Sequence, residues 1–135
     1  MIIGFTCGVF DLFNAGHVLM LEKVKKQCDY LIVGIQTDPT LDRNDKNLPV
    51  QSLFERMIEV EACKYVDKVI IYETEKDLED LLSYLDINKR FVGMDHKDGF
   101  MTGKDICEKR GIEIIYLERG GRFSSSDLRK RVKEA

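Results

Sequence analysis

The chain has 135 residues, of which 44% are hydrophobic and 33% charged, so it has the composition of a globular domain and not of a disordered segment. Its formal net charge of -3 gives no reason to expect DNA or RNA as a partner. No apolar run approaches the length that spans a membrane, and the start lacks the pattern of a signal peptide. We therefore expect a cytoplasmic protein with no membrane partner.

Short β-prone runs alternate with helix-prone segments along the chain, and no repeat or change in composition divides it. A polar loop that contains both prolines is predicted at 37–50. Strands are predicted at 2–9, 30–36, 67–72, 89–94 and 112–117, and helices at 17–27, 52–65, 75–85, 103–111 and 125–135. The alternation predicts an α/β fold, with residues 1–135 forming a single Rossmann-like, doubly wound domain around a five-stranded parallel sheet.

The four cysteines form neither a C-x-x-C pair nor another spacing typical of a metal site. A chain of this size with a large apolar fraction does not need a disulfide framework. We therefore predict that the thiols are reduced and hold no structural zinc ion; they are Cys7, Cys28, Cys63 and Cys107.

The turn after the first predicted strand, residues 8–17, leads into a helix. A helix start has free backbone N–H groups and the positive end of the helix dipole, so it suits a phosphate. Gly8 and Gly16 allow the backbone to approach an anion, and His17 is placed to donate a hydrogen bond to a phosphoryl oxygen. The alternative is an ordinary helix start in which Asn14 is the N-cap and His17 a surface residue. The turn matches neither the P-loop nor G-x-G-x-x-G.

The last predicted helix begins with three consecutive serines that follow two arginines, Arg119 and Arg122. Ser124 and Asp127 have the spacing of a capping box, so an ordinary capped helix with a solvated basic face is one interpretation. The segment nevertheless offers more donors than a cap requires. Hydroxyls, free N–H groups and guanidinium ions together would suit the β- and γ-phosphates of a nucleotide.

Residues 8–38 resemble the opening of the cytidylyltransferase-like nucleotidyltransferases, which carry G-x-F-D-x-x-H-x-G-H before a helix and a strand that ends in a threonine or serine and an aspartate. Residues 119–129 resemble the second signature of that family, an arginine followed by a hydroxyl run at the last helix. The resemblance extends over essentially the whole chain. It is greatest to the small bacterial enzymes that make CDP-glycerol from CTP and glycerol 3-phosphate.

This resemblance implies transfer of CMP from CTP to a small phosphorylated acceptor, with release of pyrophosphate. The acceptor would be glycerol 3-phosphate or another precursor of cell-surface polysaccharide or capsule, such as L-glutamine phosphate. Mg²⁺ is the expected cofactor, held largely by the phosphates and water, and a homodimer is the expected assembly. Two alternatives stay open: adenylyl transfer, because the serine-rich helix start also resembles adenylyltransferases, and a nucleotide-binding protein with weakened catalysis.

One position departs from the family pattern. His17 matches the second histidine of H-x-G-H, whereas Asn14 occupies the position of the first. An asparagine amide can donate a hydrogen bond but cannot become a cation. By analogy with the loss of an oxyanion-hole donor, we expect transition-state stabilisation to fall by about 2.7–4 kcal/mol, or about 10²–10³ in rate.

The resemblance also assigns roles to individual residues. The catalytic residues would be Asn14, His17, Lys46 and Arg119. The nucleotide-binding residues would be Cys7, Gly8, Val9, Phe10, Asp11, Gly16, Asp95, Arg119, Ser124, Ser125 and Ser126. The acceptor-binding residues that it implies would be Lys46 and Arg56. We also expect His96 and Arg122 to bind the acceptor, although Arg122 is not part of the family's second signature. From the residues alone, Lys46 could equally be a solvated loop residue, Arg56 a surface ion-pair partner of Glu59, and Arg122 a solvent-facing cation.

Overall fold

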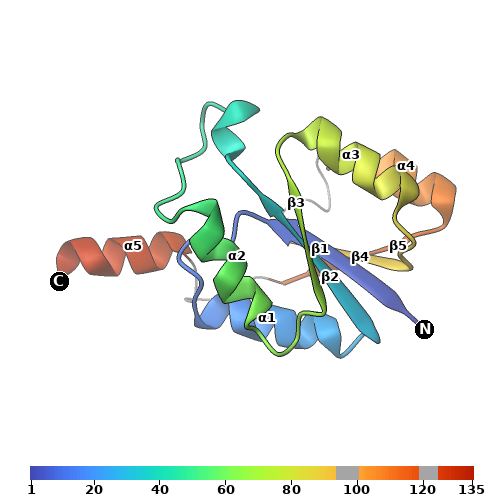
Figure 1. Ribbon diagram of the computed structural model, residues 1–135, viewed down its shortest axis with the longest axis horizontal. Coiled ribbons are helices and arrows are strands. Elements are labelled where there is room, and N and C mark those ends of the chain that lie inside the picture. Colours follow the sequence, from blue (N-terminus) through green and yellow to red (C-terminus); the bar gives the residue numbers. More distant parts are fainter. Residues whose placement is uncertain (94–100, 119–124) are drawn as a thin grey trace.

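Five parallel strands form one sheet in the computed structural model, which describes residues 1–93, 101–118 and 125–135 (Figure 1). The strands lie in the order β3-β2-β1-β4-β5. Their bounds are β1 Ile3–Gly8, β2 Tyr30–Gln36, β3 Lys68–Tyr72, β4 Lys89–Gly93 and β5 Glu113–Leu117. The predicted α/β fold with a five-stranded parallel sheet is therefore confirmed.

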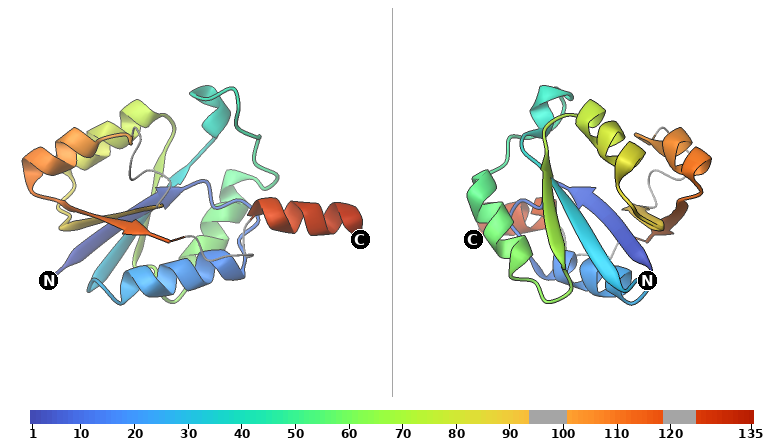
Figure 2. Two further views of the ribbon diagram at one scale, coloured as in Figure 1. Left: turned by 180° about the vertical axis from the view of Figure 1, so that it is seen from behind. Right: turned by 45° about the vertical axis from the view of Figure 1, so that its right-hand side comes forward.

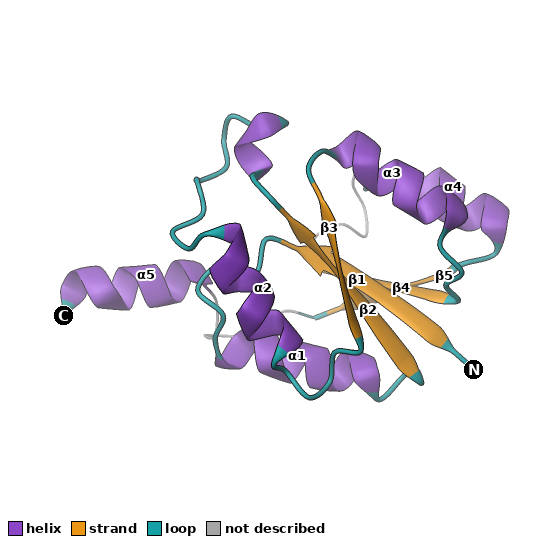
Figure 3. Ribbon diagram, in the orientation of Figure 1, coloured by secondary structure: helices purple, strands orange, loops and turns teal. Residues whose placement is uncertain are grey.

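Helices cover both faces of this sheet (Figure 2). One face is covered by α1 (Ala15–Lys25) and α2 (Leu53–Glu61), and the other by α3 (Glu75–Tyr84) and α4 (Lys104–Arg110) (Figure 1). The final helix, α5 (Ser125–Glu134), projects away from the body of the molecule (Figure 3). Within the part of the chain that the structure describes, no helix has both the length and the apolar character needed to span a membrane.

Neighbouring residues of the strands point into two separate cores, because successive side chains of a strand face opposite sides of the sheet. Ile32 of β2 packs with Phe5 under α3 and α4, whereas the next residue, Val33, packs with Phe91 under α1 and α2. Strand β2 is buried from Leu31 to Gln36, which explains why its sequence is an almost continuous apolar run.

The predicted elements agree with the structure apart from a few residues at their ends. The predicted helix at 103–111 is shorter because Gly103 and Gly111 both have left-handed backbone conformations, with φ of 77° and 71°. Residues with a Cβ rarely adopt such angles, so these two glycines flank α4. The predicted loop at 37–50 contains a short 3-10 helix, Pro39–Leu41, which begins after the cap residue Asp38.

The direction in which strands are added reverses between β1 and β4. From β1 the chain proceeds outward to β2 and β3, and it then returns to the other side of β1 to form β4 and β5. β1 and β4 pair at two positions, Gly4 with Lys89 and Phe5 with Arg90, after which the Thr6 hydroxyl donates to the Phe91 carbonyl at 3.1 Å. The carboxyl ends of these strands therefore flank the position where ligands bind in open α/β sheets.

Candidate functional site

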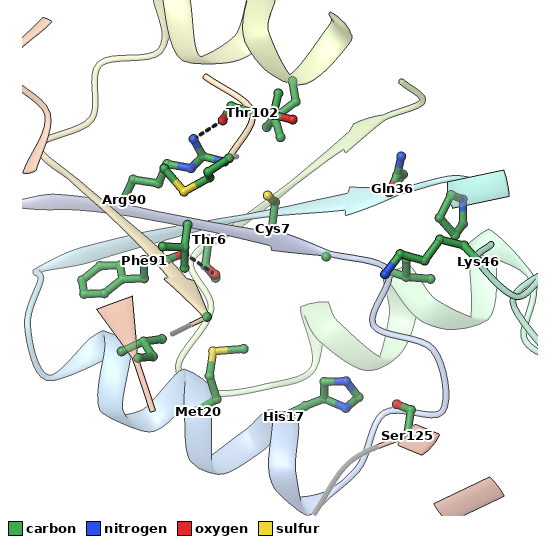
Figure 4. Close-up of a pocket in the computed structure, with 18 of the residues that line it drawn as sticks. Thr6, Cys7, His17, Met20, Gln36, Lys46, Arg90, Phe91, Thr102 and Ser125 are labelled. Atoms are coloured by element: carbon green, nitrogen blue, oxygen red, sulfur yellow. Dashed lines mark hydrogen bonds between the residues drawn. The ribbon is translucent and has the colours of Figure 1, made fainter. Parts of the chain in front are cut away.

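A pocket of about 610 Å³ lies at the carboxyl ends of β1 and β4 (Figure 4). Its walls also include the starts of α1 and α5, the loop after β2 and the start of α3. Nine residues that the sequence assigned to a site line this pocket: Cys7, Gly8, Val9, Asn14, Gly16, His17, Lys46, Ser125 and Ser126. The structure thus brings the two predicted phosphate-binding segments to one cavity.

Asn14 is the N-cap of α1, as the structural interpretation of the sequence predicted. Its Oδ1 accepts a hydrogen bond from the Gly16 N–H at 2.9 Å, and its Nδ2 donates to the Leu12 carbonyl at 2.8 Å. The same Nδ2 lies 3.5 Å from Oγ of Ser125 at the start of α5. The amide therefore caps one helix and links it to the start of another, on the wall of the pocket.

His17 is held by its neighbours in one tautomer. Its Nδ1 accepts the backbone N–H of Asn14 at 3.0 Å, so a neutral ring carries its proton on Nε2. The ring stacks on Phe13 with 5.3 Å between centroids and an interplanar angle of 3°. Burial lowers the pKa of His17, and the Asp11 carboxylate opposes this change. His17 therefore offers its Nε2–H as a neutral donor.

Asp11 joins three segments of the chain. Its carboxylate accepts the backbone N–H groups of Val50 at 2.8 Å and Gln51 at 2.9 Å, and it forms an ion pair with Arg129 of α5. Ser125 Oγ also donates to the Asp11 carbonyl at 2.6 Å. Asp11 is 5% exposed and does not line the pocket. These contacts make it a positioning residue, and its predicted contact with nucleotide stays a prediction.

The backbone of the β1–α1 turn is strained around Asp11. Phe10 and Leu12 have positive φ angles of 54° and 52°, which residues with a Cβ seldom adopt. Phe10 is buried at 5% exposure, and its ring centroid lies 5.5 Å from that of His17. Phe10 thus supports the histidine from outside the pocket, while its predicted role in binding nucleotide stays a prediction.

Arg56 lies in the interior and not on the surface. It is 2% exposed, so the alternative of a surface ion pair with Glu59 is wrong. Its guanidinium donates to the carbonyls of Val9 at 3.1 Å, Gln36 at 2.6 Å, Thr37 at 2.7 Å and Gln51 at 3.2 Å. These bonds fix the ends of β1 and β2. Arg56 does not line the pocket, and its predicted role in acceptor binding stays a prediction.

The loop that contains Lys46 is attached to the start of α3. Arg43 forms an ion pair with Glu75 at 3.4 Å, and the Asp42 carboxylate accepts the backbone N–H of Glu75. Lys46 lines the pocket, and its side chain extends toward the strand ends (Figure 4). Lys46 therefore brings a cation to the wall of the pocket.

The remaining predicted site residues lie outside the part of the chain that the structure describes. They are Asp95, His96, Arg119, Arg122 and Ser124. Their assigned roles stay predictions.

Sequence reasoning missed the opposite wall of the pocket, under α3 and α4. It is formed by Tyr72, Glu75, Arg90 and Thr102. One signal was present: Arg90 is a charged residue inside the predicted strand 89–94, and strands of a sheet covered on both faces are mostly apolar. A charged side chain at such a position is rare unless it forms an ion pair or binds a ligand.

Metal ligands do not gather in the described parts of the chain. Among residues 1–93, 101–118 and 125–135, no three His, Cys, Asp or Glu side chains lie together as a metal site. The Asp11 carboxylate is occupied by two N–H groups and an arginine. Mg²⁺ held mainly by triphosphate oxygens and water fits this donor set and stays a prediction.

Comparison with known proteins agrees with this geometry. The sequence profile of the family described as Cytidylyltransferase-like matches residues 5–131. The chain belongs to the cytidylyltransferase-like family. This membership confirms the predicted superfamily and the class of enzyme, a nucleotidyltransferase.

Sequence relatives of this cytidylyltransferase-like chain include bifunctional proteins named HldE. The protein from Campylobacter jejuni subsp. jejuni serotype O:6 is 38% identical over 133 residues, which cover 98% of this chain and 28% of that protein. The one from Hyphomonas neptunium is 35% identical over 116 residues, covering 85% and 24%. The chain therefore spans about a quarter of the length of these relatives. They do not support the finer likeness to glycerol-3-phosphate cytidylyltransferases.

Solved structures share the fold. The lipopolysaccharide core biosynthesis protein from Thermoplasma volcanium GSS1 has a TM-score of 0.70 and 27% identity, over 89% of this chain and 97% of that one. Pantoate-beta-alanine ligase from Francisella tularensis has a TM-score of 0.57 and 19% identity, over 98% and 69%, and this second likeness shows the fold alone.

Proposed function

We propose that this chain transfers CMP from CTP to a small phosphorylated acceptor and releases pyrophosphate. The observation that carries the proposal is the convergence of two helix starts on one pocket. Ser125 Oγ lies 3.5 Å from Asn14 Nδ2 and donates to the Asp11 carbonyl at 2.6 Å, although these residues are more than a hundred positions apart. Each helix start carries the positive end of its helix dipole, so two helix starts beside one pocket form a surface suited to a polyphosphate.

The reaction requires positioning and charge stabilisation from the protein. A phosphate oxygen of the acceptor attacks the α-phosphorus of CTP, and the bond from that phosphorus to the bridging oxygen of pyrophosphate breaks. The His17 Nε2–H, the positive end of the α1 dipole and the Lys46 ammonium would stabilise the negative charge on the phosphoryl oxygens. Mg²⁺, when bound with the nucleotide, would neutralise part of the triphosphate charge.

Asn14 should lower the rate of the proposed reaction. Its amide is already used by Leu12, Gly16 and Ser125, so it has little capacity left for a phosphoryl oxygen. We infer that nucleotide binding is retained better than turnover. Pyrophosphate release is the assay, with labelled CTP, Mg²⁺ and a panel of small phosphorylated acceptors, on this chain and on Asn14→His. Nucleotide binding without release from either form would reject the proposed activity and favour a nucleotide-binding protein.

Adenylyl transfer is the second candidate, because the serine-rich start of α5 also resembles adenylyltransferases. Calorimetric titration with CTP and ATP separates the two, and a clear preference for ATP would reject cytidylyl transfer. We also propose that the chain forms a homodimer and acts in the cytoplasm. Light scattering after size-exclusion chromatography tests the dimer.

A further inference from the structure

Arg90 is a buried cation whose bonding capacity is only partly used. It lies on β4, is 3% exposed and lines the pocket. Its Nη1 donates to the Thr102 carbonyl and lies 4.0 Å from Sγ of Cys107, whereas its Nε has no hydrogen-bond partner. Among the residues that the structure describes, no carboxylate forms an ion pair with it.

The side chains around Arg90 do not neutralise it. Burial raises the pKa of the Cys7 thiol, an effect that the Arg90 charge only partly counters, and burial also raises the pKa of the Tyr72 hydroxyl far above its ordinary value of 10.0. Both groups are therefore neutral at physiological pH. Glu75 lines the same wall but is paired with Arg43 at 3.4 Å. Among the described residues this buried guanidinium has no counter-ion, which is costly and points to a bound anion as its partner.

The position of Arg90 separates it from the triphosphate-binding end. Arg90 and Thr102 lie on one side of β1, whereas His17 and Ser125 lie on the other (Figure 4). This agrees with the cores, because Sγ of Cys107, a residue of α4, lies 4.0 Å from Arg90 and belongs to the core between the sheet and the helices α3 and α4. An acceptor that reacts beside His17 and Lys46 would extend past Cys7 toward Arg90.

We propose that Arg90 determines acceptor specificity by binding a carboxylate that the acceptor carries in addition to its reacting phosphate. The inference rests on the proposed function, because the reacting phosphate must lie at the His17 end. The unpartnered Nε–H gives a carboxylate a charge-assisted hydrogen bond, and a guanidinium suits the planar shape of a carboxylate. The neutral Tyr72 hydroxyl, which interacts with the Cys7 thiol, lies on the same wall and brings no negative charge that would repel a carboxylate. The substrate class is therefore a small phosphate ester of a hydroxy acid or amino acid.

The test uses acceptor pairs that differ by one carboxylate. Glycerol 3-phosphate is compared with 3-phosphoglycerate, and ethanolamine phosphate with O-phosphoserine, by kcat/KM for pyrophosphate release and by calorimetric binding. We expect this chain to prefer the carboxylated member of at least one pair by about 10-fold or more, as a charged hydrogen bond allows. Arg90→Met should abolish that preference and leave the carboxylate-free member within about threefold. Arg90→Lys, which keeps the charge, should retain part of it.

Equal use of both members of each pair by this chain would overturn the proposal. An equal loss for both members in Arg90→Met would also overturn it, because it would place Arg90 on the reacting phosphate or in a structural role. Unchanged CTP affinity shows that each variant is folded. If no acceptor supports pyrophosphate release, even with Asn14→His, the proposed function fails. Calorimetric binding of the acceptor pairs then still decides whether Arg90 binds a carboxylate.

Discussion

The two ends of the pocket are built in opposite ways. At the α1 and α5 end, the polar groups of Asp11, Asn14 and Ser125 bond to backbone atoms and to one another. At the α3 and α4 end, the Arg90 guanidinium is buried with its Nε unpartnered. The side chains at the first end hold the fold together as well as line the site, whereas the guanidinium at the second end has an unused hydrogen-bond donor that a ligand can take. Substitutions should therefore reduce stability and also change activity at the first end, but change recognition alone at the second.

Replacing Asn14 by histidine should have the largest effect. If the position stabilises the transition state, turnover should rise by about 10²–10³, equivalent to about 2.7–4 kcal/mol. The N-cap bond from Asn14 Oδ1 to the Gly16 N–H is lost, so the free energy of unfolding should fall by about 1 kcal/mol. Steady-state assays measure the turnover, and urea denaturation measures the free energy of unfolding. An unchanged turnover would refute the catalytic role of this position.

Removing the carboxylate in Asp11→Ala should cost about 3 kcal/mol of stability. Two backbone N–H groups and the Arg129 guanidinium lose their acceptor at a site that is 5% exposed. The measurement is urea denaturation. Asp80→Ala is the matched control, since Asp80 forms an exposed ion pair with Lys76 at 3.0 Å and should leave stability nearly unchanged. Equal effects in the two variants would contradict the scaffold role of Asp11.

Ser125→Ala should weaken triphosphate binding by about tenfold, or about 1.4 kcal/mol, because the hydrogen bonds that link the start of α5 to Asp11 and Asn14 disappear and the two helix starts are no longer held together. Calorimetric titration with CTP measures the change. Ser83→Ala removes an exposed hydroxyl that donates within α3 at 2.8 Å, and it should have no effect on CTP affinity. If Ser125→Ala binds CTP as tightly as the unchanged chain, α5 does not take part in binding the triphosphate.

Arg90→Met should change the free energy of unfolding by no more than about 1 kcal/mol. The cost of burying the guanidinium disappears, and this offsets the lost bond to the Thr102 carbonyl. Urea denaturation of Arg90→Met and of Asp11→Ala compares the loss of stability at the two ends of the pocket. A loss as large as that of Asp11→Ala would show that both ends are scaffold.

The smallest expected effect is a pH dependence of stability at the α1 end. The pKa of folded His17 lies below the ordinary value of 6.5, so between these values the unfolded chain binds a proton that the folded chain does not. The free energy of unfolding should therefore fall as the pH falls through 6.5. Denaturation between pH 5 and 8 measures it, with His17→Asn as a control that should reduce the dependence. A chain whose stability rises on acidification through this range would contradict the neutral state assigned to His17.

The sequence predicted the α1 and α5 end because its information is local. Glycines, a capping residue and a serine run at helix starts are patterns within a few residues of one another, and they lead to Gly16, His17 and Ser125. Alternating apolar runs likewise predicted the strands. The contacts of Asp11 could not be predicted in this way, because its side chain bonds to residues 39 to 118 positions away. Those of Arg56 could not either, because they reach from Gln51, 5 positions away, to Val9, 47 positions away. Arg90 was visible as a charge in an apolar strand, but its surroundings depend on β3, α3 and Thr102, which only the folded chain brings together.

The most direct test of the central claim is a crystal structure of the chain with Mg²⁺ and a non-hydrolysable CTP analogue. We predict that the triphosphate lies between the starts of α1 and α5, with phosphate oxygens within hydrogen-bonding distance of His17 Nε2 and of the Ser126 hydroxyl. A nucleotide bound with its phosphates at the Arg90 wall, or away from both helix starts, would contradict the account.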